Sequence, residues 1–145
     1  MKNLLLLGLV VLAVICVAPG ARAQGTAKTG PDASTVRDPE IEKDSLHNLE
    51  VARQYFRVKK AYVAALARCE EIIAGNPTFA RLDEVLYIAG ASSLRLSQKM
   101  GKQASKTPPE KLREDAREYL SRLAKEFPES EFRASADKDL STIKQ

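Results

Sequence analysis

Two stretches decide the fold: residues 62–77 read YVAALARCEEIIAGNP, and residues 113–128 read REDAREYLSRLAKEFP. In each stretch, apolar residues recur three or four positions apart, as on one face of a helix, and a proline closes the run. The second stretch repeats the first at an offset of 51 residues. The matched positions are Ala65 with Ala116, Cys69 with Leu120, Ile72 with Leu123, and Pro77 with Pro128. A helix that recurs with the same apolar stripe predicts a repeat protein.

The helices after the two prolines also match, because Val85 and Ala89 correspond to Ala136 and Leu140. The small residue at the head of each stripe predicts a close approach of two paired helices. A bulky side chain there would overpack the contact, at a cost of about 1–3 kcal/mol. We expect the larger residues of the stripe to fill the space between one helix pair and the next.

The periodicity predicts helices over residues 38–60, 61–74, 82–98, 108–127 and 130–143. Asp38 and Pro39 suit the cap and the first position of a helix. Gly75 is expected to form a left-handed stop ahead of Pro77. Thr107-Pro108-Pro109-Glu110 is expected to form a capping box. No run combines strand periodicity with strand composition. We therefore predict an all-α fold of about five helices, arranged in antiparallel pairs as a short right-handed superhelix.

Residues 1–23 are predicted to be a signal peptide. A positive Lys2, an apolar run over residues 4–17 and the small-residue pattern Ala21-Arg22-Ala23 support cleavage near Ala23. A transmembrane anchor is the alternative. A lipoprotein anchor at Cys16 would need a small residue before it, whereas the sequence has Ile15, so we interpret Cys16 as part of the signal. Lipidation of Cys16 stays open.

Residues 24–37 are rich in Gly, Thr, Ala, Ser and Pro and lack apolar periodicity, which predicts a disordered tether. Residues 38–145 then form the helical domain, with units at about 38–77 and 78–128 and a capping helix at 130–143. Loss of the signal would leave 21 of the 23 basic residues against 19 acidic ones. This near balance, in an exported protein, argues against nucleic-acid binding.

No pattern of chemistry-bearing residues points to catalysis. His47 is the sole histidine and has no neighbours at metal-ligand spacing. The adjacent carboxylates Glu70-Glu71 point about 100° apart on a helix, so they do not pair as an acid and a base. Cys69 lies on the apolar stripe, where a buried, inert thiol is expected. We predict a protein that is not an enzyme, with no cofactor, no metal and no small-molecule substrate.

The spacing of small residue, apolar residue and closing proline resembles the tetratricopeptide consensus. More narrowly, the chain resembles the BamD-like family of outer-membrane assembly factors. The resemblance covers residues 48–140. Its motifs are Ala52-x-x-Tyr55-Phe56, Tyr62-x-x-Ala65, Asn76-Pro77, Asp83-Glu84-Val85-Leu86-Tyr87-x-x-Gly90 and Phe127-Pro128-x-Ser130-x-Phe132-x-x-x-Ala136. Arg53 departs from the consensus, because a small residue is usual at its position.

In tetratricopeptide folds the first helix of each pair lines a groove that binds peptides or partner helices. The resemblance implies that His47, Glu50, Gln54 and Arg57 line it in the first unit, and Glu84, Tyr87, Ala91 and Arg95 in the second. An ordinary solvated helix face is the alternative for all eight positions.

The resemblance implies an exported, periplasmic helical-repeat adaptor that acts in cell-envelope or outer-membrane protein assembly. Its partners would be other envelope proteins or peptides, with peripheral association to an outer-membrane complex. The alternative is a structural subunit of a larger envelope or cell-division complex, which packs through its repeat end and has no peptide-binding groove. An exposed Leu or Ile on the last helix would favour that alternative.

Overall fold

The structure is a computed structural model that describes residues 38–143, all of which lie in one compact unit, Pro31–Gln145. The predicted signal peptide and tether lie outside the described residues. Residues 38–143 form five α-helices and no strand. The elements are α1 (Pro39–Arg53), continued by a π-helical segment, η1 (Gln54–Lys59), then α2 (Tyr62–Gly75), α3 (Leu82–Ser97), α4 (Pro109–Glu126) and α5 (Arg133–Ile143).

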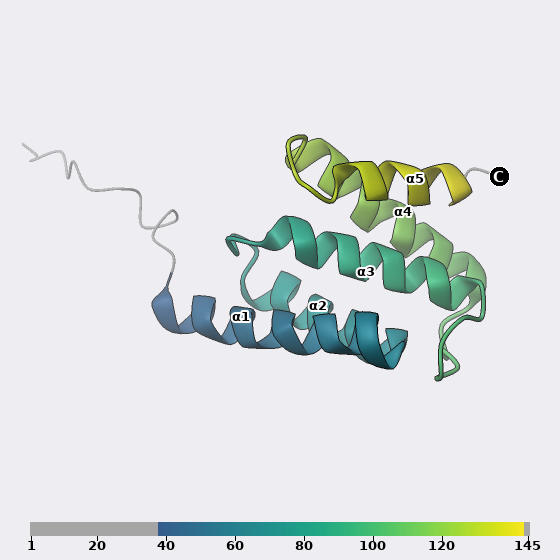
Figure 1. The fold of residues 1–145 in the computed structure, drawn as a ribbon, viewed down its shortest axis with the longest axis horizontal. Helices are drawn as coiled ribbons and strands as arrows, with labels where there is room; N and C mark the ends of the chain where they lie inside the picture. Colours follow the sequence, from purple (N-terminus) through teal and green to yellow (C-terminus); the bar gives the residue numbers. More distant parts are fainter. Residues whose placement is uncertain (1–37, 144–145) are drawn as a thin grey trace, which may run out of the picture. The chain divides into compact units, whose positions relative to one another are not determined.

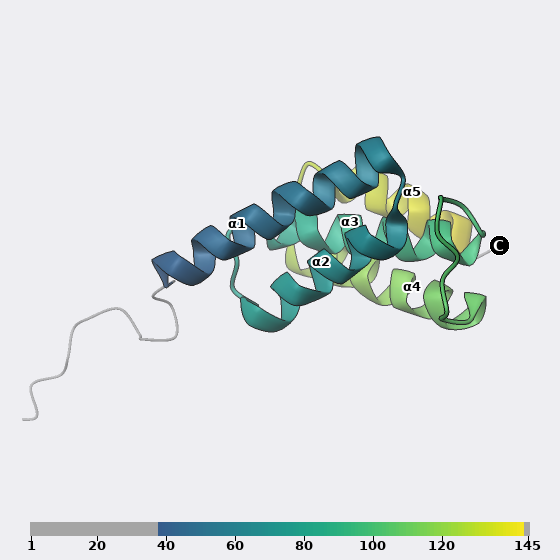
Figure 2. The same ribbon diagram turned by 90° about the horizontal axis from the view of Figure 1, so that it is seen from below.

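The helices are arranged in two layers (Figures 1 and 2). Helices α1, α3 and α5 lie side by side in one layer, and α2 and α4 form the other. Each helix packs antiparallel on the next one in the sequence. The all-α, tetratricopeptide-like prediction is confirmed. No helix among residues 38–143 is both long enough and apolar enough to cross a bilayer.

The first helix begins and ends as the sequence predicts. The Asp38 carboxylate accepts a hydrogen bond from the Glu40 backbone N–H at 2.9 Å, and Pro39 takes the first helical position. At the other end Lys60 adopts the left-handed conformation, with φ of 54°, and the chain turns into α2. The π-helical stretch before it is a wider coil that often marks functional positions.

Three local predictions are wrong: the last helix begins at Arg133 and not near Ser130, and prolines explain the other two. Gly75 is not left-handed: it is the last residue of α2, and the helix ends at Asn76, which has φ of −142°. The residue before a proline avoids the helical region, so Pro77 determines this end. The same rule places Pro108, before Pro109, in an extended conformation with ψ of 146°. Helix α4 therefore starts one residue later than predicted, and the N-cap has no side-chain hydrogen bond.

The repeated apolar stripe on α2 and α4 is buried against neighbouring helices, as predicted. Ala65 and Ala116 are completely buried, as are Cys69, Leu120 and Leu123. Helices α3 and α4 approach closely at Gly90, where an added Cβ would lie 2.6 Å from Leu120 Cγ. Small residues on both helices therefore make this contact.

Candidate protein-binding surface

The candidate residues of the first unit are open to solvent. His47, Glu50, Gln54 and Arg57 are all exposed on the α1–η1 helix. The last three of them line a depression of about 330 Å³ together with Arg53 and Val58. The depression offers hydrogen-bond donors, acceptors and charges of both signs beside one apolar side chain. Those groups suit contact with a polar peptide or a partner helix.

Two candidates of the second unit lie inside the domain instead. Glu84 is 1% exposed and Ala91 is fully buried, so neither lines an open groove. The expectation came from helical register alone. In the structure the neighbouring helices α1 and α5 lie against α3 on either side and cover this part of it.

Tyr87 and Arg95 are partly buried and join elements of this layer. The Tyr87 ring stacks on Phe132 at a centroid distance of 5.3 Å and meets Phe56 edge-on at 6.4 Å. The Arg95 guanidinium lies 4.8 Å from the centroid of the Phe56 ring and 5.7 Å from that of Tyr62. These contacts make both residues part of the packing between helices, so the fully exposed candidates all belong to the first unit.

An ion-pair cluster around the buried Glu84 explains why Arg53 departs from the consensus. Arg53 Nε and Nη2 donate to the two carboxylate oxygens of Glu84 at 2.7 and 2.6 Å. Arg81 lies 2.8 Å from the same carboxylate and Arg57 lies 3.7 Å from it. Burial by itself would raise the pKa of Glu84, but the Arg53 hydrogen bonds and the charges of the three arginines outweigh it and lower the pKa. The cluster fixes α1 and η1 to α3.

This lowered pKa predicts how the cluster responds to acid. At pH 7 we expect Glu84→Gln to destabilise the protein by about 1–2 kcal/mol, because the amide keeps the shape but loses the charge-assisted bonds. A carboxyl with a lowered folded pKa stabilises fully above its unfolded pKa of about 4.3, and the effect is lost as pH falls through the folded value. The stability gap between wild type and variant, from urea unfolding, should therefore narrow below about pH 4.

The exposed Glu50 provides the control for this titration. Glu50 contacts Arg53 at 2.9 Å, but its side chain is 72% exposed. Glu50→Gln should change stability by less than about 0.5 kcal/mol at every pH, since exposed ion pairs contribute little. A gap for Glu84→Gln that stays constant from pH 7 to pH 3 would contradict the assignment.

A second kind of contact, which was not predicted, occurs once in each of the two units. The Glu42 carboxylate, near the start of α1, accepts from Asn76 Nδ2 and from the Ala80 backbone N–H, both at 3.1 Å. Near the start of α3, the Asp83 carboxylate accepts from Ser130 Oγ at 2.6 Å. In both cases an acid in the first turn of one helix binds the turn that closes its own helix pair. In the sequence, this contact could have been recognised from an acidic residue in the first turn of the first helix, together with a polar residue near the proline that closes the pair.

The last helix, α5, does not show the exposed Leu or Ile that would favour a structural subunit. Leu140 is half-buried, and Ile143 is only 9% exposed. The large apolar residues that are exposed among residues 38–143 lie elsewhere: Ile41, Leu46, Val58 and Met100. The repeat end formed by α5 therefore lacks the apolar face on which that alternative would depend.

The layers, the paired helices and the open face of the first pair define an all-α protein of tetratricopeptide-like repeats. Residues 33–145 match the YfiO family, which is described as an outer membrane lipoprotein family, and the chain belongs to it. This match confirms the resemblance to the BamD-like assembly factors. No curated protein and no solved structure matches the chain.

The family description directs attention to the cysteines, because a lipoprotein is acylated on a thiol. Cys69 is fully buried, and burial raises the pKa of its thiol, with smaller contributions from Glu70 and Glu84. It therefore fits the inert core role that the stripe predicts. Cys16 lies outside the described residues, and its interpretation as part of a signal peptide stays a prediction.

Proposed function

We propose that the protein is a periplasmic adaptor that binds other envelope proteins during outer-membrane protein assembly, with no catalytic step of its own. The family match over residues 33–145 carries this proposal. The open first unit supports it, since an adaptor of this class needs an exposed helix face beside a rigid repeat. No group of three or more His, Cys, Asp or Glu side chains among residues 38–143 is arranged to hold a metal ion.

The proposed contact surface is the depression on α1–η1, and its residues indicate what it binds. Gln54 offers both a donor and an acceptor, and Arg57 brings a charge that is 61% exposed. Glu50 adds an exposed carboxylate on the same helix. Such a surface fits a short polar segment or a helix face with an acidic residue opposite Arg57.

Site-specific crosslinking in cells tests the surface directly. A photoreactive residue in place of Gln54 should crosslink to an envelope protein, and one in place of Arg117 should not. Arg117 is exposed on α4, in the other layer of the domain, and so reports contacts of an unrelated face. Crosslinks of equal yield from both positions, or from Arg117 alone, would move the binding surface away from α1.

A double variant tests how much the proposed surface on α1–η1 contributes to binding of the partner. Gln54→Ala with Arg57→Glu should weaken capture of the crosslinked partner at least about tenfold, since loss of central interface residues typically costs more than 1 kcal/mol. Circular dichroism and urea unfolding must show that the fold persists, because Arg57 also lies 3.7 Å from the buried Glu84 carboxylate. Arg117→Glu brings the same change of charge and should leave capture unchanged. Equal loss of capture for both variants would show a general charge effect instead.

A further inference from the structure

One end of the domain gathers lysines and no acid. It is formed by the turn at residues 59–62, KKAY, and the loop at residues 98–108, QKMGKQASKTP, which we call the lysine end. Its five lysines are Lys59, Lys60, Lys99, Lys102 and Lys106. The chain as a whole is nearly balanced, with 23 basic and 19 acidic residues, so this local excess is a property of the end and not of the composition.

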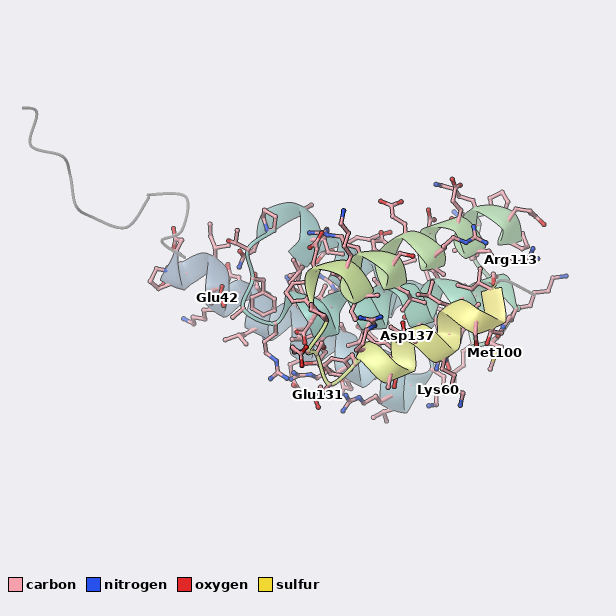
Figure 3. All side chains as sticks on the ribbon, turned by 90° about the horizontal axis from the view of Figure 1, so that it is seen from above. Glu42, Lys60, Met100, Arg113, Glu131 and Asp137 are labelled. Atoms are coloured by element: carbon pink, nitrogen blue, oxygen red, sulfur yellow. The ribbon has the colours of Figure 1, made fainter. Side chains whose placement is uncertain are left out.

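The two segments lie together in space. The Lys102 backbone N–H donates to the Lys60 carbonyl oxygen at 3.3 Å. Gly101 adopts φ of +100°, and a Cβ there would lie 2.7 Å from the Tyr62 ring. Only glycine allows the loop to approach the turn this closely. Figure 3 places Lys60 and Met100 at the same end of the domain, opposite the end that carries Glu42.

The charges of the lysine end are not neutralised within the domain. All five lysines are exposed, and none of them forms an ion pair with another residue between 38 and 143. Lys59 lies over the Tyr55 ring, 4.8 Å from its centroid. The acidic groups next to this end are Glu110, in the first turn of α4, and Asp139 of α5, which faces Arg95.

Apolar side chains accompany the lysines. Met100 is 47% exposed, and Val58, which precedes the turn, is 74% exposed. Beneath the loop lies a pocket of about 420 Å³, whose lining combines Leu96, Met100 and Pro109 with lysine side chains. Lysines around exposed apolar groups are the pattern of a surface that lies on a bilayer, with the cations at the headgroups and the apolar groups below them.

We propose that the lysine end docks on an anionic phospholipid surface, with Met100 entering the headgroup region. Charge complementarity favours this occupant, because each lysine close to such a surface raises the partition constant roughly fivefold. The attraction extends about one Debye length, roughly 8 Å, from the membrane surface. The site is separate from the proposed partner surface on α1, and its test uses other residues.

Lysine footprinting on the full chain tests the docking. The protein is acetylated with vesicles of phosphatidylcholine alone or of phosphatidylcholine with phosphatidylglycerol, and each lysine is quantified by mass spectrometry. Anionic vesicles should reduce labelling of Lys99, Lys102 and Lys106 at least about threefold, and salt at 0.5 M should remove the protection. Lys43, Lys125 and Lys138, exposed on other parts of the domain, should label equally with both vesicles. Because each comparison is made within one molecule, membrane attachment elsewhere in the chain does not produce it.

Two matched variants separate the site from net charge. Lys99→Gln with Lys102→Gln and Lys106→Gln should abolish the protection of Lys59 and Lys60. The control, Lys43→Gln with Lys125→Gln and Lys138→Gln, removes the same charge and should retain it. Both should keep the wild-type circular-dichroism spectrum.

Three results would overturn the proposal. They are equal protection at all lysines, protection by neutral vesicles, and protection by polyglutamate without protection by vesicles. The last would assign the lysine end to an acidic protein.

Discussion

Leu120→Ala is expected to destabilise the protein by about 2–5 kcal/mol, the range for large-to-small changes in a closed core. Leu120 is fully buried on α4 and packs on Gly90 of α3, at a close contact between the two layers. The loss removes apolar contacts and leaves a cavity that rigid helices fill only in part. Urea unfolding followed by circular dichroism at 222 nm gives the free energy directly.

Leu46→Ala is the matched control, because Leu46 lies on α1 with 47% of its surface exposed. The same chemical change there should cost less than about 0.5 kcal/mol. If the two variants unfold at the same urea concentration, Leu120 does not lie in the buried contact between α3 and α4 and the repeat assignment fails.

Gly90→Val is expected to destabilise the protein near the upper end of the range of about 1–3 kcal/mol for overpacking. The new Cβ would lie 2.6 and 2.8 Å from two Leu120 side-chain carbons and 3.3 Å from the Ala116 carbonyl oxygen. The Leu120 side chain must therefore shift, and the α4 backbone at Ala116 must give by a few tenths of an ångström. In a helix without such a contact, replacing glycine would raise stability. The sign of the effect therefore tests the contact itself.

Gly75→Ala is the control for the direction of the stability change, because no atom lies within 4 Å of a Cβ at Gly75. We expect it to be neutral or slightly stabilising. Gly90→Ala combined with Leu120→Ala should cost less than the sum of the two single changes, because the truncated side chain gives the added methyl room. Strict additivity of the pair would show that the two residues do not meet.

The fold was predictable because two kinds of residue can be recognised in the sequence alone: the small residues where helices meet and the prolines that end helices. Ala65 and Ala116 mark the close approaches, and Pro77 and Pro128 end the second helix of each pair. Two of the helix boundaries that were wrong came from reading Gly75 and Thr107 as isolated motifs. In both places a following proline restricts the backbone more strongly than the motif does.

The candidate surface was predictable only in part. Helical register placed Glu84 and Ala91 on the face of α3 that a groove would use. Register does not show how near α1 and α5 come to that face. The sequence feature that indicated the burial of Glu84 was Arg53, a long cation in place of a small residue. Arg53 donates a hydrogen bond to Glu84, which lies 31 positions later in the sequence. Phe132, which closes over Tyr87, comes from the turn beyond the second unit.

The acid-to-turn contacts of Glu42 and Asp83 bear on how such a chain could have grown. Each of these hydrogen bonds joins a helix pair to the turn that follows the same pair. Duplication of the gene segment that encodes the pair and its turn would therefore copy both partners of the contact. A duplicated gene segment would arrive with its own means of closure and would need only a matching apolar stripe to stack. Addition or loss of a whole hairpin would therefore change the length of such a chain without new acid-to-turn contacts having to evolve.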